Sequence, residues 1–359
     1  MKRLIRFGKI KQFRDVVRTI SHKARFDGLD ENQNPIYNSD PLPTIMAIGT
    51  EKIHGTNAAV CYSHPDGMWT QARKKILTIE SDNAGCAFFV ESRKDIFKSI
   101  INELAGIHSI DLNRNIISIF FEFAGGSIQP KSACTGMEKR AIIFAHFKVS
   151  PLEPQGYDEE GIETDEYAEW LDTHHVCSTH YSIFNISRFV KWAIQIDFNA
   201  PSLSVNSMIK LVADNVEPNS PAGQAMGVDG NVGEGIVFSF HYRGERYIWK
   251  VKGEKHSGSK IKKLQPVDEE KENKIIDFVN LIACKPWRLE QAYQEVFNTL
   301  NGGKGDIKKT GDFLRWVIND VIAEESDILN DLGLEPKGVK AKISHVARTW
   351  FMNKLQYDL

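Results

Sequence analysis

The pattern of hydrophobic and polar positions divides this chain into two parts with different periodicity. Between residues 44 and 252, short apolar or alternating runs recur, and such runs indicate β-strands. A longer amphipathic stretch, "CAFFVESRKDIFKSIINELAG", predicts a helix among them. The strand candidates are "TIMAIGTE", "NAAVCYS", "IISIFFEFAG", "RAIIFAHFKV", "EGIVFSF" and "RYIWKVK". We therefore predict an α+β domain of strongly antiparallel character over residues 44–264.

After about residue 265, the apolar residues follow helical spacing. Apolar side chains recur at intervals of three and four from Leu289 to Leu300 and again from Val339 to Trp350, which places each set on one face of a helix. The stretches "KIIDFVNLIA" and "DFLRWVINDVIA" also read as helices. We predict a smaller, all-helical C-terminal domain over residues 265–359, with the boundary near Leu264–Pro266.

Residues 1–43 precede the first predicted strand. Their basic start, "MKRLIRFGKIKQFRDVVRTI", shares its charge with organellar transit peptides but lacks the serines typical of them. Phe13, Val16, Val17 and Ile20 have a helical spacing that suits docking on a core. We interpret residues 1–43 as an N-terminal extension that packs on the main domain.

Composition narrows the classes of protein to consider. Hydrophobic residues make up 42% and charged residues 26% of the chain, as in ordinary globular proteins, and no apolar run is long enough to predict a membrane span. The five cysteines form no CxxC pair, so neither a zinc site nor a disulfide framework is indicated. We expect the protein to be located in the cytoplasm. This expectation includes the cytoplasm of a host cell infected by a virus or phage. Because the net charge of the chain is −2, nucleic acid would have to bind at a local basic patch, such as Arg243 to Lys263.

Residues 49–60, "GTEKIHGTNAAV", raise the question of a nucleophilic lysine. The spacing KxxG occurs four times, headed by Lys52, Lys250, Lys255 and Lys308, so spacing alone does not decide. A lysine that attacks a nucleotide α-phosphate needs neighbouring cations to lower its pKa and to hold the phosphate. It also needs carboxylates for a divalent metal and an apolar or aromatic sandwich for the base.

Residues that meet these needs occur downstream. Lys250 and Lys252 share one face of the predicted strand "YIWKVK", because alternate residues of a strand point the same way. Glu122 interrupts an apolar strand and Glu234 begins another, and a buried acid needs a cationic or metal partner. Arg73 is a candidate phosphate ligand. For each of these residues taken alone, the alternative interpretation is an ordinary charged side chain on the surface.

Taken in order, "EKIHG", an arginine, "FEFAGG", an aromatic strand, "EGIV" and "KVK" resemble the nucleotidyltransferase motifs of DNA ligases, RNA ligases and mRNA-capping enzymes. "EKIHGTN" looks like the RNA ligase 2 family, which contains phage double-strand RNA repair ligases and kinetoplastid RNA-editing ligases. The resemblance covers about residues 44–252. DNA ligases and capping enzymes usually have aspartate at the place of His54, and usually carry a β-barrel domain where this chain has its helical pattern.

The resemblance implies an antiparallel-sheet nucleotidyltransferase domain and an ATP-dependent RNA ligase. Such an enzyme forms a lysyl–AMP intermediate, here on Lys52, and joins RNA 3′-OH and 5′-phosphate ends, here in RNA repair. ATP and Mg²⁺ are the implied cofactors, with Mn²⁺ as a substitute, RNA ends are the implied partner, and we expect a monomer. A DNA ligase or capping guanylyltransferase on the same core is one alternative, and a catalytically inactive polynucleotide-binding protein is another.

Roles are implied only for positions that match the motifs. Glu51, Ile53, Asn57, Arg73, Glu122 and Phe144 would bind the nucleotide, with Glu51 by the adenine, and Lys250 and Lys252 would hold the α-phosphate. Glu234 would support the metal, Asn57 would do so through water, and Thr56 and Arg73 would contact the RNA end. Phe147 is the alternative to Phe144 for stacking on adenine. His146 stands near a position where the family usually has an aspartate.

Overall fold

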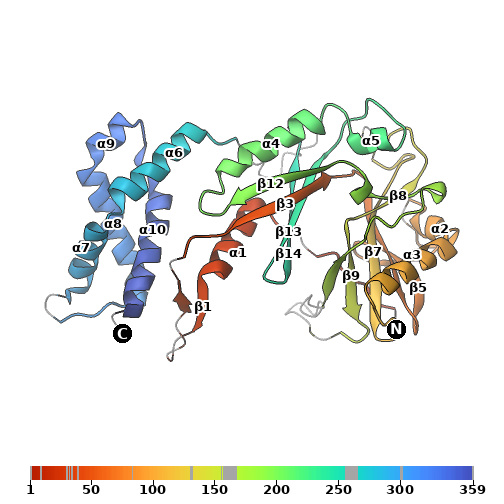
Figure 1. Cartoon of the computed structure of the whole chain (residues 1–359), viewed down its shortest axis with the longest axis horizontal. Helices are drawn as coiled ribbons and strands as arrows, with labels where there is room; N and C mark the ends of the chain where they lie inside the picture. Colours follow the sequence, from red (N-terminus) through yellow and green to blue (C-terminus); the bar gives the residue numbers. More distant parts are fainter. Residues whose placement is uncertain are drawn as a thin grey trace. The chain divides into compact units, whose positions relative to one another are not determined.

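A computed structural model of the chain describes residues 2–357, except 9, 30, 32, 34, 39, 83, 130, 131, 155, 157–167, 255–265, 300 and 301. It contains antiparallel sheets followed by a helical C-terminal region (Figure 1), which confirms the predicted α+β class. The chain folds into two compact units, Met1–Val16 with Met46–Gln195 and Ser207–Leu264, and Val17–Ile45 with Ile196–Asn206 and Gln265–Leu359. The predicted boundary at residue 264 lies outside the described residues, and the predicted division into domains stays a prediction.

An eight-stranded sheet forms most of the first unit, with strand order β10-β9-β7-β4-β5-β6 and with β8 and β11 beside this path. The pairs are antiparallel, apart from the parallel pair of β8 and β11. The strands are β4 (Thr56–Ser63), β5 (Gly67–Ala72), β6 (Ile76–Leu77), β7 (Asn115–Ala124), β8 (Arg140–Ile143), β9 (His146–Pro151), β10 (Glu169–Asp172) and β11 (Ile183–Asn185).

The two faces of this sheet have different neighbours, as the central strand β7 illustrates. Its odd-numbered residues from Ile117 to Phe123 pack in a core with helices α2 (Cys86–Glu91) and α3 (Lys94–Ile107). Its even-numbered residues Ile116 and Phe120 pack in a separate cluster on the opposite face. Glu122 belongs to this second face, because strand residues alternate between faces. The alternation therefore decides where Glu122 points.

A second sheet in the same unit has the order β12-β3-β13-β14. Trp249, on β14, is fully buried, and its Nε1 donates to Sδ of Met208 on α4 at 3.3 Å. Phe238 and Val251 are buried on the same face, so Lys250 and Lys252 point the other way, as the alternation predicted. The elements are β3 (Thr44–Glu51), β12 (Lys191–Asp197), β13 (Gly235–Tyr242), β14 (Glu245–Lys252), α4 (Leu203–Asn215), α5 (Pro221–Ala225), η1 (Thr179–Tyr181) and η2 (Ile186–Arg188).

Two predicted elements are interrupted. The strand predicted over residues 140–149 divides into β8 and β9, because two extra residues, Phe144 and Ala145, stand between the partner pairs Ile143–Phe121 and Lys148–Ser118. Such bulges bend a strand beside a site. The helix predicted over residues 86–106 breaks at Ser92 and Arg93, between α2 and α3.

The second unit contains the predicted C-terminal helices, a β-hairpin and most of α1. Helix α1 (Phe13–Arg25) spans both units and confirms the helical spacing in the N-terminal region, with Phe13, Val16 and Ile20 buried. Within the unit, Arg25 donates to the hydroxyl of Thr349 on α10 at 2.7 Å. The other elements are β1 (Phe26–Leu29), β2 (Pro35–Tyr37), α6 (Glu269–Phe278), the π-helical turn η4 (Val279–Ala283), α7 (Pro286–Phe297), η6 (Ile307–Lys309), α8 (Thr310–Glu324), α9 (Ser326–Asp331) and α10 (Pro336–Tyr357).

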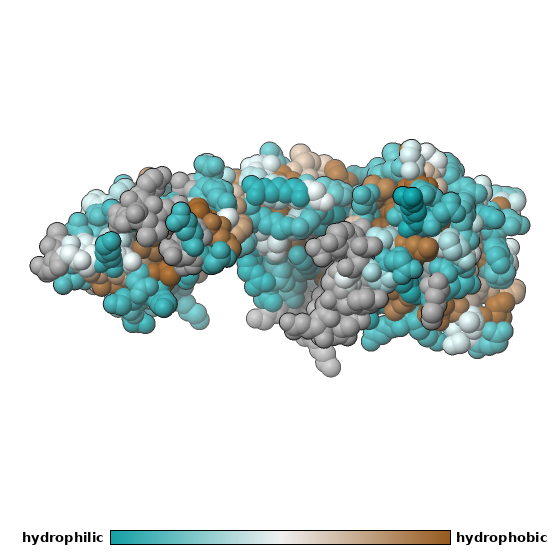
Figure 2. All heavy atoms as spheres, turned by 90° about the horizontal axis from the view of Figure 1, so that it is seen from below, coloured by the Kyte–Doolittle hydropathy of each residue, from teal (hydrophilic) through white to brown (hydrophobic). Residues whose placement is uncertain are grey.

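The face of the molecule seen in Figure 2 is mainly polar. On this face, hydrophilic residues predominate and hydrophobic residues form small separate patches. None of the helices in the described part of the chain combines the length and apolarity needed to cross a bilayer.

Arg288 is a buried, ion-paired charged side chain in the helical unit. Its side chain is 2% exposed and pairs with Asp320 at 2.9 Å and with Glu325, and it also donates to the carbonyl oxygen of Ala283 at 3.1 Å. Removing one partner leaves buried charges uncompensated. We expect Arg288→Ala to lower the free energy of unfolding by about 3 kcal/mol or more, measured by urea unfolding followed by circular dichroism.

Arg315 supplies a matched control. It lies on α8 in the same unit, is 71% exposed and, among the described residues, pairs only with Asp312, one turn away. Arg315→Ala should change stability by less than about 0.5 kcal/mol. Equal losses in the two variants would contradict the special role of Arg288.

Candidate active site

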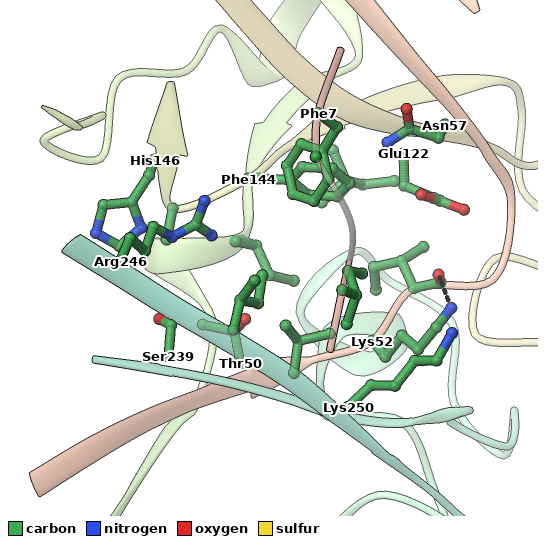
Figure 3. Close-up of a pocket in the computed structure, with 18 of the residues that line it drawn as sticks. Phe7, Thr50, Lys52, Asn57, Glu122, Phe144, His146, Ser239, Arg246 and Lys250 are labelled. Atoms are coloured by element: carbon green, nitrogen blue, oxygen red, sulfur yellow. Dashed lines mark hydrogen bonds between the residues drawn. The ribbon is translucent and has the colours of Figure 1, made fainter. Parts of the chain in front are cut away.

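A cleft of about 1790 Å³ lies between the two sheets of the first unit. The smaller sheet presents Thr50 from β3 and Arg246 and Lys250 from β14 to it, and Lys52 follows directly after β3. The larger sheet presents Asn57, Glu122 and Phe144. Figure 3 shows these side chains converging from the two sides, with Lys52 and Lys250 close together and Arg246 with His146 apart from them.

The carboxylate of Glu234 gathers the cations at one end of the cleft. Its Oε2 lies 2.5 Å from Lys52 Nζ and 3.1 Å from His54 Nδ1, and its Oε1 lies 2.6 Å from Lys252 Nζ. The side chain of Glu234 is 1% exposed and that of Lys52 is 19% exposed. Three basic side chains, two from the loop after β3 and one from β14, therefore meet at one buried acid.

The backbone fixes Glu234 in this position. Gly235 has a φ of +154°, and a Cβ there would lie 2.1 Å from the carbonyl oxygen of Val251, so a larger residue would force β13 and β14 apart. The carbonyl oxygen of Gly235 also accepts a hydrogen bond from the amide of Lys52 at 2.8 Å. The same glycine thus aligns Lys52 and Glu234.

The glycine of the KxxG spacing has a physical reason as well. A Cβ on Gly55 would lie 2.4 Å from the carbonyl oxygen of Phe123 and 3.0 Å from Cγ of Glu122. Its amide donates to Oε1 of Glu122 at 3.0 Å. Gly55 thereby lets the chain after Lys52 approach β7 closely and orients the Glu122 carboxylate toward the cleft.

Charge and burial shift the pKa values in this group in different directions. Burial would raise the pKa of Glu234, but the hydrogen bond from His54 and the charges of Lys52 and Lys252 outweigh it and hold this pKa well below its ordinary value. Burial, aided by the Glu234 charge, raises the pKa of Glu122 to about 7 against the opposing effects of Lys52 and Gly55. Burial and the charges of Lys52 and Lys252 lower the pKa of Lys250. The cations thus repel one another at a site with one strongly anionic group.

Glu51, directly before Lys52, has its own set of partners. Its Oε1 accepts from the hydroxyl of Ser220, and its Oε2 accepts from the amide of Ala222 at 2.8 Å. Burial raises the pKa of Glu51 to about 7, although both hydrogen bonds lower it. Both oxygens are therefore engaged by the segment that starts α5. The predicted contact of Glu51 with adenine stays a prediction.

The two candidate stacking residues lie in different surroundings. Phe144 lines the cleft. Phe147 is fully buried in the core on the helix-covered face of the larger sheet, with its ring centroid 5.3 Å from that of His108. The alternation of the strand explains the difference, because positions 144 and 147 have opposite parity. Of these two residues, Phe144 is the one that faces the cleft.

The structure brings most of the predicted site residues together. Two predicted residues, Glu234 and Lys252, are not part of the lining but are joined to Lys52 through the ion pairs described above. Ile53 is 4% exposed and also packs in a hydrophobic cluster below the cleft. The predicted residues that line the cleft are Glu51, Lys52, Ile53, Thr56, Asn57, Arg73, Glu122, Phe144 and Lys250. Their roles stay predictions.

Sequence reasoning missed the contribution of the N-terminal segment and the far end of β14. Phe7 lines the cleft, with its ring centroid 5.3 Å from that of Phe144. Nothing in the sequence around Phe7 predicts this placement, because the segment has no regular structure. Arg246 could have been found, since it shares the parity of Lys250 and Lys252 on one predicted strand.

A divalent metal has a limited set of protein donors here. Within the described residues, no group of three or more His, Cys, Asp or Glu side chains has an arrangement that could hold a metal ion. Both oxygens of Glu234 contact cationic partners. Glu122 and Asn57 are direct partners across β7 and β4. A divalent metal here would have to be held by one or two protein side chains together with waters and substrate phosphates, a mode of binding common for Mg²⁺.

Comparisons with known proteins give structural likeness without a sequence match. No family model matches the sequence, and no curated protein matches it. Solved structures of an RNA ligase from Naegleria gruberi are similar to the chain. A mutant with ATP and Mn has 12% identity and a TM-score of 0.37 over 69% of this chain and 56% of that chain. The same ligase with PPi has 12% identity and a TM-score of 0.38 over 70% and 57%. The chain thus spans somewhat more than half the length of those ligase chains.

The raised pKa of Glu51 predicts a pH dependence of stability. The fold favours the protonated acid, so the contribution of Glu51 is fully present below pH 4.5 and is lost as pH rises through about 7. Glu51→Gln mimics the protonated form at every pH. Relative to this variant, the wild type should lose on the order of 3 kcal/mol between pH 5 and 8.

Urea unfolding of both proteins at pH 5, 6, 7 and 8 measures this difference. Glu122 has a similarly raised pKa, but it is present in both proteins and largely cancels in the comparison. A stability difference that stays constant over this pH range would show that Glu51 does not titrate as its burial predicts.

Proposed function

We propose that this protein is an ATP-dependent RNA ligase that works through a covalent lysyl–AMP intermediate on Lys52. The observation that carries the proposal is the cation cluster around Glu234, in which Lys52, His54 and Lys252 converge at the end of a large cleft. This arrangement places an amine beside the positive groups that a phosphate requires. The resemblance of "EKIHGTN" and the later motifs to RNA ligase 2 enzymes supports the same reading.

In the first step, Nζ of Lys52 attacks the α-phosphorus of ATP. The ammonium group of Lys52 first gives one proton to solvent and becomes the nucleophilic amine. The N–P bond then forms, the bond to the pyrophosphate oxygen breaks, pyrophosphate leaves, and Nζ gives a second proton to solvent. Glu234, to which Nζ is hydrogen-bonded, orients Nζ. Lys250 and Lys252 stabilise the negative charge that develops on the phosphate oxygens. Burial and the charges of two neighbouring lysines lower the pKa of Lys250. The lowered pKa reflects repulsion between the ammonium groups, and a phosphate bound among them would relieve this repulsion.

The later steps use the same groups. The AMP passes from Lys52 to an RNA 5′-phosphate, and a 3′-hydroxyl then attacks that activated end and releases AMP. Arg73, exposed at the end of β5 and lining the cleft, is proposed to contact the RNA end together with Thr56. Positioning of the reacting ends supplies much of the rate enhancement in such transfers.

Mg²⁺, or Mn²⁺ in its place, is proposed as the metal. It would neutralise charge on the nucleotide phosphates and stabilise the pyrophosphate leaving group. Glu122 would hold it directly, with Asn57 beside it acting through water. Direct ligation by Glu234 would first require this carboxylate to release one of its basic partners. We therefore assign Glu234 mainly to the orientation of Lys52 and Lys252.

The alternatives make different predictions. A capping enzyme on the same core would use GTP, and a DNA ligase would seal DNA nicks. A binding protein without catalysis would form no covalent adduct.

The helical second unit is proposed to assist engagement of RNA ends, and an RNA-repair role in the cytoplasm would follow from such an activity.

Covalent labelling tests the nucleophile. The protein is first stripped with pyrophosphate, then incubated with α-labelled ATP or GTP and Mg²⁺, and denatured. We expect a labelled band with ATP that Lys52→Ala abolishes, because no other group at this position can form the N–P bond. Lys94→Ala is the control, since Lys94 is exposed on α3 and pairs with Glu91, one turn before it. No band with either nucleotide would reject the ligase, and a GTP band would favour capping.

Sealing assays test the polynucleotide. We expect a nicked RNA duplex to be joined about tenfold faster or more than the matching nicked DNA duplex, a difference of about 1.4 kcal/mol in activation free energy. The reason is the likeness of "EKIHGTN", with histidine rather than aspartate before the glycine, to RNA ligases. Gel separation of labelled strands measures both rates. Faster sealing of DNA would favour the DNA ligase alternative.

A further inference from the structure

The two sheets that form the cleft are joined by the main chain near Lys52. Strand β3 of the smaller sheet continues through residues 52–55 into β4 of the larger sheet. Figure 3 shows Arg246 and His146 on the opposite side of the view from Lys52. At this Arg246 end of the cleft, the sheets meet through side chains, such as the rings of His146 and His241, whose centroids are 5.3 Å apart. We therefore expect any separation of the sheets to begin at the Arg246 end.

An N-terminal segment crosses from the larger sheet to the smaller one, and we call residues 3–8, 10 and 11 the strap. On the larger sheet, the amide of Ile5 donates to Oε1 of Gln71 on β5 at 3.0 Å, and the side-chain amide of Gln71 donates back to the carbonyl oxygen of Ile5. Nζ of Lys148 on β9 donates to the carbonyl oxygen of Arg6 at 3.1 Å. Ile5 is 1% exposed, so this anchor is buried.

The other anchor of the strap lies on the smaller sheet. The amide of Lys11 donates to the carbonyl oxygen of Ile248 on β14 at 3.2 Å, and Lys11 forms a parallel bridge with Trp249. A fully extended chain spans about 3.5 Å per residue, so the chain from Ile5 to Lys11 reaches at most about 21 Å. The strap therefore limits how far Gln71 and Ile248 can move apart while both anchors hold.

Between the two anchors, the half-buried ring of Phe7 packs among aromatic rings of the larger sheet. The centroids of Phe120, Phe144 and Trp170 lie 5.1, 5.3 and 5.3 Å from its own, all in edge-to-face geometry, and Figure 3 shows Phe7 beside Phe144. From the smaller sheet, the guanidinium carbon of Arg246 lies 4.7 Å from the Trp170 centroid and 5.8 Å from that of Phe7, an attractive arrangement of a cation over rings. Phe7 is thus part of the contact between the sheets.

The face of the larger sheet beneath the strap is partly polar. Gln71 is 2% exposed and Lys148 is 3% exposed, although residues of these types are seldom fully buried. Both side chains would regain water if the strap lifted, which offsets part of the free energy needed to expose Ile5. A segment held by the contacts of a few residues opens locally at a lower free energy than a core does. The strap can therefore leave the larger sheet without unfolding it.

We propose that the strap is a latch that holds the two sheets closed on each other at the Arg246 end of the cleft. With Phe7 docked, the strap joins the sheets at this end as residues 52–55 join them at the other. When Ile5 and Phe7 leave the larger sheet, the tether is lost and the sheets swing apart about residues 52–55. The docking of Phe7 thus decides how far the cleft opens. The latch is a property of the fold and does not depend on the proposed reaction of Lys52.

Cys61 on β4 is a natural reporter of strap release. It packs in the same buried cluster as Ile5, and its Sγ donates to Oε1 of Gln71 at 3.5 Å. Cys61 is fully buried, and burial raises the pKa of its thiol to about 12, so the docked strap protects it from alkylation. Its rate of alkylation therefore follows the population of molecules in which the strap is released.

Alkylation by N-ethylmaleimide, assigned to each cysteine by mass spectrometry of proteolytic fragments, tests the latch. Phe7→Ala should accelerate the alkylation of Cys61 about tenfold or more, because loss of the half-buried ring weakens docking. Arg6→Ala is the matched control, since the Arg6 side chain is exposed and the variant keeps the carbonyl oxygen. Its Cys61 rate should equal that of the wild type. Cys86, on the helix-covered face of the same sheet, and Cys284, in the helical unit, should react at unchanged rates in both variants.

A distance across the cleft tests whether strap release separates the sheets. Glu169 on β10 and Arg243 in the turn after β13 are exposed and belong to different sheets. Spin labels attached through p-acetylphenylalanine at these two positions leave the cysteines unlabelled. Pulsed electron paramagnetic resonance should give one narrow distance distribution for the otherwise unchanged protein. Phe7→Ala should add a population at longer distance, and Arg6→Ala should not.

Three results would each overturn the latch. Unchanged alkylation of Cys61 in Phe7→Ala would show that Phe7 does not hold the strap. Faster alkylation with an unchanged distance distribution would show that the strap covers the larger sheet without holding the two sheets together. Equal acceleration at Cys61, Cys86 and Cys284 would show a loss of overall stability instead of local release. These results are independent of adduct formation by Lys52, which covalent labelling tests separately.

Discussion

A single buried carboxylate organises the candidate site. Glu234 is 1% exposed, and an acid so enclosed is tolerated only with charged partners. Lys52 and His54 supply them from the loop after β3, and Lys252 from the end of β14. The ion pairs thereby tie the loop after β3 and the end of β14 to the start of β13. A polar cluster of this kind specifies how these segments align, because a misaligned segment would leave a buried charge without its partner.

The opposed faces of two sheets turn this cluster into a site. Each strand sends alternate residues into a hydrophobic core and into the cleft, so the chemistry is carried by every second position. On β7, Phe121 and Phe123 stabilise the core while Glu122 faces the cleft. On β14, Trp249 is buried while Lys250 faces the cleft. One face of each strand thus stabilises the core, and the other face carries the polar side chains of the cleft. A register shift of one residue would turn the core residues to the cleft and the cleft residues to the core.

The two ends of the cleft differ in electrostatic character. At the lysine end, cations surround one strongly anionic carboxylate, and the mutual repulsion of the lysines contributes to the lowered pKa of Lys250. At the other end, aromatic rings surround Arg246, whose pKa is lowered by burial alone.

The sequence by itself determined which positions of several strands carry chemistry. Alternation in "YIWKVK" placed Lys250 and Lys252 on one face, and periodicity after residue 265 correctly predicted helices, since both signals depend only on neighbouring residues. The tertiary structure alone decided what meets across the cleft. The bulge at Phe144 and Ala145, the partners of Glu51 and the placement of Phe7 against Phe144 depend on contacts between residues far apart in the chain. Such contacts leave no local pattern, because their energy comes from packing and hydrogen bonding that exist only once both sheets have formed.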